Sequence, residues 1–111
     1  MTKDGAARDD DGSCPDVEAP DGAVVQTFQI INRKGLHARA TAKLVQCIDG
    51  FNAEVTISRC GETVGGNSIM GILTLGAGPG MTITVTASGA EAGQAIAAIG
   101  ALIASRFGEE E

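Results

Sequence analysis

The sequence predicts an α+β fold, an open-faced two-layer sandwich in the order βαββαβα. Two helical patterns, over residues 38–48 and 90–107, repeat apolar residues every three or four positions. Between and around them lie short segments in which apolar and polar residues alternate, as is typical of strands. Residues 81–86 place three threonines on one face, which is expected to contact water. We therefore predict a four-stranded antiparallel sheet with three helices on one face.

The first 22 residues differ in composition from the rest of the chain. They contain seven acidic and two basic residues, with several Gly and Pro and almost no large apolar side chain. Such a composition is typical of a disordered segment, because it buries too little apolar surface to offset the entropy lost on folding. We expect residues 1–22 to form an acidic tail and residues 23–111 to form one folded domain.

The first half of that domain contains a strand, a turn and a helix. Residues 24–31 predict a strand whose inward face includes Phe28 and Ile30. Residues 33–35 are expected to turn, and a helix is expected to begin near His37 or Ala38. Its buried stripe has the spacing i, i+3, i+4 and i+7, and consists of Thr41, Leu44, Val45 and Ile48. Asp49 and Gly50 should end this helix.

The second half contains three strands and two helices. Residues 53–59 predict a strand that turns at 60–62 into a short strand beginning at Thr63. Asn67 or Ser68 can cap a short helix. Residues 81–86 form the clearest strand pattern, with Met81, Ile83 and Val85 on the inward face. The longest helix is expected over residues 90–107, with Phe107 on its apolar face.

Composition excludes several classes of function. The formal net charge of −6 argues against a nucleic-acid partner. No apolar run is long enough to span a bilayer, so we expect a soluble, cytoplasmic protein. We also expect it to be a monomer. Cys14, Cys47 and Cys60 lack the spacing of a zinc site, and we expect three free thiols. No metal or other cofactor is indicated.

The chemistry of the chain points to His37, the only histidine. Four of the eight basic residues lie within residues 33–43, and no acidic residue falls between Asp21 and Asp49. A neutral imidazole is a competent nucleophile near physiological pH. The first backbone amides of the following helix, those of Ala38, Arg39 and Ala40, would bind phosphoryl oxygens, and the Arg39 guanidinium would add a charged donor. The alternative is an ordinary histidine at a helix start.

Several motifs carry a family resemblance that extends over residues 24–110. They are Gly35-Leu36-His37-Ala38-Arg39, Lys43-Leu44-Val45, Phe51-Asn52-Ala53-Glu54-Val55, the segment from Asn67 to Gly76, and Phe107-Gly108-Glu109. Together they resemble HPr, the histidine phosphocarrier family of the bacterial phosphotransferase system, and are most similar to its nitrogen-related branch. The family usually has Pro where this chain has Ala40. Alanine is an excellent helix former, so we expect the helix to persist there.

The resemblance implies a role for each of these sites. His37 would accept a phosphoryl group from enzyme I, at the expense of phosphoenolpyruvate, and pass it to a IIA component, with Arg39 stabilising the phosphate. The protein would be a stoichiometric carrier rather than a stand-alone catalyst. Ser68 matches a serine that HPr kinase/phosphorylase phosphorylates in some bacteria. The residues matching the family's partner-docking face are Ala42, Lys43, Gln46, Ile69, Met70 and Leu73.

Two other functions remain open from the sequence. One is a non-catalytic regulatory binding protein that uses the face around Ser68, Ile69 and Met70, with His37 vestigial. The other is a small ligand-binding or RNA-binding domain of ferredoxin-like type. The negative charge and the low aromatic content, three Phe with no Tyr or Trp, weigh against RNA. The His37-Ala38-Arg39 helix start and the last helix weigh against the ferredoxin-like comparison.

Overall fold

The computed structural model describes residues 22–109, which form one sheet and its covering helices. The elements are β1 (Val24–Gln29), α2 (Ala38–Asp49), β2 (Glu54–Arg59), β3 (Glu62–Gly65), α3 (Ile69–Thr74), β4 (Thr82–Ser88), α4 (Ala92–Ala104) and the 3-10 turn η1 (Arg106–Gly108). This order confirms the predicted βαββαβα arrangement. The predicted acidic tail lies outside the described residues, apart from Gly22.

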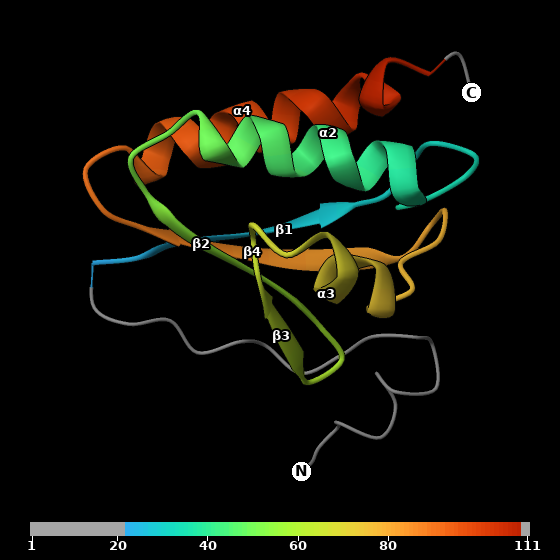
Figure 1. Ribbon diagram of the computed structural model, residues 1–111, viewed down its shortest axis with the longest axis horizontal. Helices are drawn as coiled ribbons and strands as arrows, with labels where there is room; N and C mark the ends of the chain where they lie inside the picture. Colours follow the sequence, from blue (N-terminus) through green and yellow to red (C-terminus); the bar gives the residue numbers. More distant parts are fainter. Residues whose placement is uncertain (1–21, 110–111) are drawn as a thin grey trace, which may run out of the picture.

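The sheet is antiparallel throughout and has the strand order β1-β4-β2-β3. Phe28 of β1 pairs with Ile83 of β4, and Val55 of β2 pairs with Ala87 of β4. Figure 1 shows α2 and α4 lying across one side of the sheet. The shorter helix α3 packs against α2 and β3. The open-faced two-layer sandwich is therefore confirmed.

The core lies between the sheet and the helices and is built from aliphatic side chains. The predicted stripe of α2 is buried, as are the inward residues of β2 and β4; these are Thr41, Leu44, Val45, Ile48, Val55, Ile57, Ile83 and Val85. Ile30 is fully buried, whereas Phe28 is partly exposed. Because one layer of helices covers one face, alternation along each strand was enough to predict most of these positions.

Three predicted features of the strands are wrong. Strand β1 ends at Gln29, two residues earlier than expected, because Ile30 bonds instead to Met81 and Gly80 in the loop before β4. Met81 precedes β4 and is 42% exposed rather than inward. Thr86, on the face expected to contact water, is buried.

The longest helix also ends earlier than predicted. Helix α4 stops at Ala104, and Arg106, Phe107 and Gly108 adopt left-handed backbone angles, with φ of 57°, 56° and 78°. Phe107 is still buried, as its apolar character indicated, but it reaches the core from this turn rather than from the helix. The chain after Ala104 is thereby redirected toward the start of α2, and η1 contacts α2.

The cysteine prediction is only partly correct. Cys47 is a free thiol, and burial raises its pKa. Cys60 is disulfide-bonded, so the prediction of a free thiol is wrong at this position. Cys14 lies outside the described residues.

Candidate functional site

A rigid turn before α2 sets the position of His37. Gly35 has φ of 67°, and a Cβ added there would lie 2.8 Å from the carbonyl oxygen of Ala77, so a larger residue does not fit. The next residue, Leu36, is buried and donates its backbone N–H to the same Ala77 oxygen at 2.9 Å. The loops before α2 and β4 therefore hold each other, and His37 follows directly at the helix start.

His37 occupies the N-cap of α2 but does not cap the helix with its side chain. The first backbone bond runs from the Thr41 N–H to the His37 carbonyl oxygen at 2.9 Å. The amides of Ala38, Arg39 and Ala40 precede that bond, so the helix offers them no acceptor, and they add to the positive end of its dipole. The imidazole is 28% exposed and is available for chemistry.

Arg39 and Ala40 lie in the first turn of α2 with different surroundings. The side chain of Arg39 is exposed, two residues beyond His37, whereas Ala40 is fully buried. The helix runs without interruption through Ala40, which confirms that alanine maintains the first turn in place of proline. The structure thus brings the predicted imidazole, amides and guanidinium to one helix end, without showing what they bind.

Two further side chains, which the sequence interpretation did not select, complete this site. Oε2 of Glu109 makes a short hydrogen bond with Nε2 of His37, and its Oε1 accepts a hydrogen bond from Nδ2 of Asn32 at 3.1 Å. Asn32 is fully buried, and its Nδ2 also donates to the Gly35 carbonyl oxygen at 2.8 Å. The three side chains come from the loop after β1, the start of α2 and the C-terminal segment.

Electrostatics favour the ionised form of Glu109. The hydrogen bond with His37, followed by the one from Asn32, holds the pKa of this carboxyl below its ordinary value of 4.5. Attraction to the positive charge of Lys34 acts in the same direction. The carboxylate is consequently charged near neutral pH, where it only accepts hydrogen bonds.

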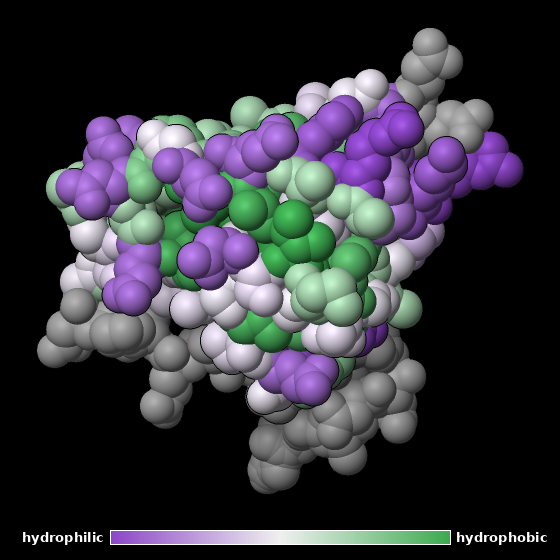
Figure 2. Space-filling view, viewed as in Figure 1, coloured by the Kyte–Doolittle hydropathy of each residue, from purple (hydrophilic) through white to green (hydrophobic). Residues whose placement is uncertain are grey.

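The predicted docking residues are shared between α2 and α3. On α3, Met70 is 72% exposed and Ile69 is 41% exposed, and Figure 2 shows a hydrophobic area between the two helices. Gln46 is also exposed, while Ala42 and Leu73 are partly buried. Lys43 is partly buried as well, because its Nζ donates to the Phe107 carbonyl oxygen at 2.6 Å. Lys43 therefore has a structural contact that the docking interpretation did not include.

Ser68 sits at the edge of this area as the N-cap of α3. Its Oγ accepts a hydrogen bond from the Gly71 N–H at 3.0 Å, which confirms the predicted cap. The side chain remains partly exposed. A phosphate on this oxygen would place negative charge at a helix start and beside Ile69 and Met70.

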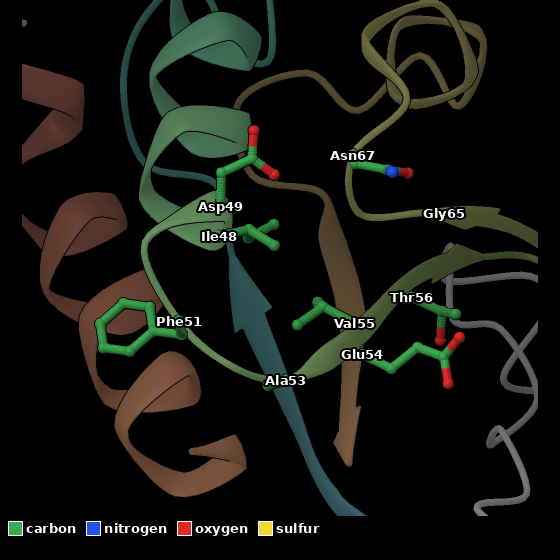
Figure 3. Close-up of a pocket in the computed structure, with 9 residues that line it drawn as sticks. All are labelled: Ile48, Asp49, Phe51, Ala53, Glu54, Val55, Thr56, Gly65 and Asn67. Atoms are coloured by element: carbon green, nitrogen blue, oxygen red, sulfur yellow. The ribbon is translucent and has the colours of Figure 1, made fainter. Parts of the chain in front are cut away.

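A separate hollow lies at the other end of α2. Figure 3 shows Asp49 and Asn67 on two sides of its opening, with Val55 between them on the sheet. None of the predicted site residues lines it. Over residues 22–109, no cluster of His, Cys, Asp and Glu is arranged to hold a metal ion. Within the same range, every helix falls short of the length and apolar character needed to cross a bilayer.

Comparisons with known proteins agree on one family. Residues 24–105 match the family model described as the HPr component phosphorylation site of the phosphotransferase system. The chain is 50% identical over 82 residues to a phosphocarrier protein HPr of Cupriavidus necator, covering 74% of this chain and 92% of that protein. It is 42% identical over 103 residues to a multiphosphoryl transfer protein of Haemophilus influenzae, covering 88% of this chain and 21% of that longer protein.

Solved structures give the same result. A crystal structure of HPr from Thermoanaerobacter tengcongensis superposes with a TM-score of 0.76 at 38% identity, covering 79% of this chain and 99% of that one. A phosphocarrier protein HPr from Bacillus anthracis gives a TM-score of 0.70, also at 38% identity, over 73% of this chain and 96% of that one. Sequence, fold and the histidine at the helix start therefore agree that this chain belongs to the HPr family, the phosphocarrier proteins of the phosphotransferase system.

Proposed function

We propose that His37 is the residue that carries the phosphoryl group, with enzyme I as donor and a IIA component as acceptor. The observation that supports this most strongly is the position of the imidazole. It is partly exposed at the N-terminus of α2, ahead of three amides that have no acceptor in the helix. This arrangement provides a nucleophile and an anion site together. We expect the protein to act as a monomer in the cytoplasm.

Each group at the helix start has a distinct task in this proposal. The imidazole attacks the phosphorus of the donor, and the leaving group keeps the electron pair of the broken bond. The backbone N–H groups of Ala38, Arg39 and Ala40 donate hydrogen bonds to the phosphoryl oxygens. The Arg39 guanidinium adds a charged donor that matches phosphate geometry. Transfer to the IIA component reverses these steps at His37.

A phosphorylation assay tests this proposal directly. The full chain would be incubated with enzyme I and phosphoenolpyruvate labelled in its phosphoryl group, and the label on the protein would be measured before and after acid treatment. We expect one acid-labile label per chain, because phosphoryl bonds to imidazole nitrogen break in acid. An unlabelled protein, with a cognate enzyme I that labels another HPr, would contradict the proposal and favour a purely regulatory binding protein.

The variant Arg39→Ala should slow phosphoryl transfer much more than it lowers stability. Removing one positioned donor from a developing phosphate charge costs about 100–1,000-fold in rate. The side chain is exposed on α2, so the free energy of unfolding should change by less than about 0.5 kcal/mol. Rapid-quench assays measure the rate of phosphoryl transfer, and urea unfolding measures the free energy of unfolding. The nearby exposed variant Lys34→Ala is the matched control. A loss of stability in Arg39→Ala together with unchanged transfer would contradict the assigned role.

We further propose that Ser68 is a regulatory phosphorylation site next to the docking face formed by Ala42, Lys43, Gln46, Ile69, Met70 and Leu73. Phosphate at the N-cap of α3 would be tolerated by the helix dipole, yet it would add charge beside the exposed Met70 side chain. Docking of an apolar partner surface should weaken as a result.

The test for Ser68 uses an HPr kinase/phosphorylase with labelled ATP. We expect acid-stable label on the wild-type protein and none on Ser68→Ala, while Thr74→Ala, which changes an exposed hydroxyl on the same helix, should label normally. The phosphorylated protein should also accept phosphoryl groups from enzyme I at least about 10-fold more slowly. Equal labelling of Ser68→Ala and wild type would contradict the assignment.

A further inference from the structure

One face of the sheet, called here the outward face, is turned away from α2 and α4 (Figure 1). Because directly paired residues share a face, the outward side chains include Val25, Thr27, Thr56, Ser58, Thr84 and Thr86. Yet Ser58 is only 1% exposed and Thr86 only 8% exposed. Within residues 22–109, the Thr86 Oγ1 is buried and has no hydrogen-bond partner. Neither α2 nor α4 shields these hydroxyls, so their burial indicates another cover.

A disulfide at the edge of this face points to the segment that covers it. Cys60 lies in the two-residue turn between β2 and β3, where it is exposed and disulfide-bonded. The chain has three cysteines, and Cys47 is a free thiol. Within one chain, this leaves Cys14 to supply the second sulfur. Cys14 precedes the described residues, so the bond would bring the N-terminal segment to the edge of the outward face.

The register of the sheet gives the distance that this segment must span. Val24, at the start of β1, pairs with Ala87 of β4, and Val55 of β2 pairs with the same residue. Cys60 follows Val55 along β2, so it lies about 17 Å further along the strands and about 10 Å across them from Val24. The diagonal from Val24 to Cys60 is therefore about 20 Å long.

The chain before β1 is long enough to cross the outward face along this diagonal. From Cys14 to Val24, an extended chain reaches up to about 33 Å. The diagonal passes over β4 near Thr86 and over β2 near Ser58, the two outward residues that are buried. We propose that residues 14–21 cover the outward face of the sheet and that a disulfide between Cys14 and Cys60 fastens them there.

The composition of the covering segment explains why it needs a covalent link. Residues 14–21 include Pro15 and Pro20, which favour an extended backbone at the residue before each of them, and only one large apolar side chain, that of Val17. Such a segment buries too little apolar surface to remain ordered by itself. A disulfide offsets this deficit because it removes much of the conformational freedom of the released segment.

The bond between Cys14 and Cys60 forms and breaks by thiol–disulfide exchange. The thiolate of one cysteine attacks a small-molecule disulfide such as oxidised glutathione and releases one thiol. The second protein thiolate then attacks this mixed disulfide and releases the other thiol. The two cysteines together lose two electrons and two protons, and the small disulfide gains both. Because Cys60 is exposed, excess thiol reverses both steps, so the cover would open under reducing conditions.

Peptide mapping of the full chain tests the disulfide. The protein would be equilibrated with oxidised glutathione, its remaining thiols blocked, and the chain digested with trypsin without reduction. Trypsin places the three cysteines on different peptides, because basic residues separate them in the sequence. We expect one linked pair of peptides, containing Cys14 and Cys60, and a separate peptide containing Cys47. Cys60 peptides linked between two copies, or the absence of the Cys14–Cys60 pair, would overturn the proposal.

NMR with a soluble paramagnetic agent tests the cover itself. The agent speeds the relaxation of methyl groups that it can approach, and it would be added to the oxidised and the reduced full chain. Relaxation of the Thr86 methyl should rise several-fold on reduction, whereas that of Ile83, which is 1% exposed and faces the helices, should not change. Oxidised Cys14→Ser should resemble the reduced protein, and the matched control Cys47→Ser should resemble the oxidised wild type. If relaxation at Thr86 were the same in all of these proteins, the segment would not cover the outward face.

Discussion

Replacing His37 by alanine is expected to reduce phosphoryl transfer from enzyme I to background. The chain contains no second histidine that could accept the group in its place. Stability should change little, by less than about 1 kcal/mol, because the side chain makes no capping bond and is 28% exposed. Acid-labile labelling from phosphoenolpyruvate measures the first effect, and urea unfolding measures the second.

The control for this variant is its interaction with enzyme I. His37→Ala should still bind enzyme I, because the exposed residues Ile69 and Met70 are unchanged. It should therefore compete with the wild type for phosphorylation. If the variant remained labelled, the acceptor would have to be another residue. If it lost both labelling and the folded state, the assay would need a smaller change, such as His37→Gln, which should also be unlabelled.

Replacing Phe107 by alanine is expected to produce the largest loss of stability among these variants, about 3–5 kcal/mol. The ring is 1% exposed, and it holds the turn that carries Glu109. The total stability of a domain of this size is about 5–15 kcal/mol, so the variant should unfold at a much lower urea concentration.

Phe28→Ala provides the comparison, because Phe28 is only partly buried against the same core. Its loss of stability should be clearly smaller than that of Phe107→Ala. Equal stability of the two variants would contradict the anchoring role of Phe107.

The sequence was sufficient to predict the elements that depend on local pattern. The stripe from Thr41 to Ile48 and the alternation of Val55 with Ile57 both report which side chains face the core. The end of α4 was not predictable in this way. Arg and Phe rarely adopt positive φ, and they do so here because Phe107 fills the core and Lys43 binds its carbonyl oxygen. Such a stop depends on tertiary contacts rather than on a glycine or proline signal.

The residues of the candidate site also fall into two groups, those predictable from a local motif and those brought together only by tertiary structure. His37 and Arg39 lie within one short motif, so their proximity to the helix start followed from the sequence. Glu109 reaches the imidazole only through the fold, since it lies 72 positions away, and Asn32 takes part only by donating to Glu109. The one available signal was the Phe107-Gly108-Glu109 motif, which was recognised without a chemical role. The short distance between Asn32 and His37 in the sequence was visible, but nothing indicated that the Asn32 side chain would be buried.

The proposed role of His37 is tested most directly by identifying the atom that carries the phosphoryl group. The wild-type chain, labelled with ¹⁵N in its histidine and phosphorylated by enzyme I with phosphoenolpyruvate, would be examined by ³¹P and ¹⁵N NMR. We predict a single phosphorus resonance coupled to Nδ1 of His37, with the proton retained on Nε2 against Glu109. Phosphorus coupled to Nε2, or found on a residue other than His37, would contradict it.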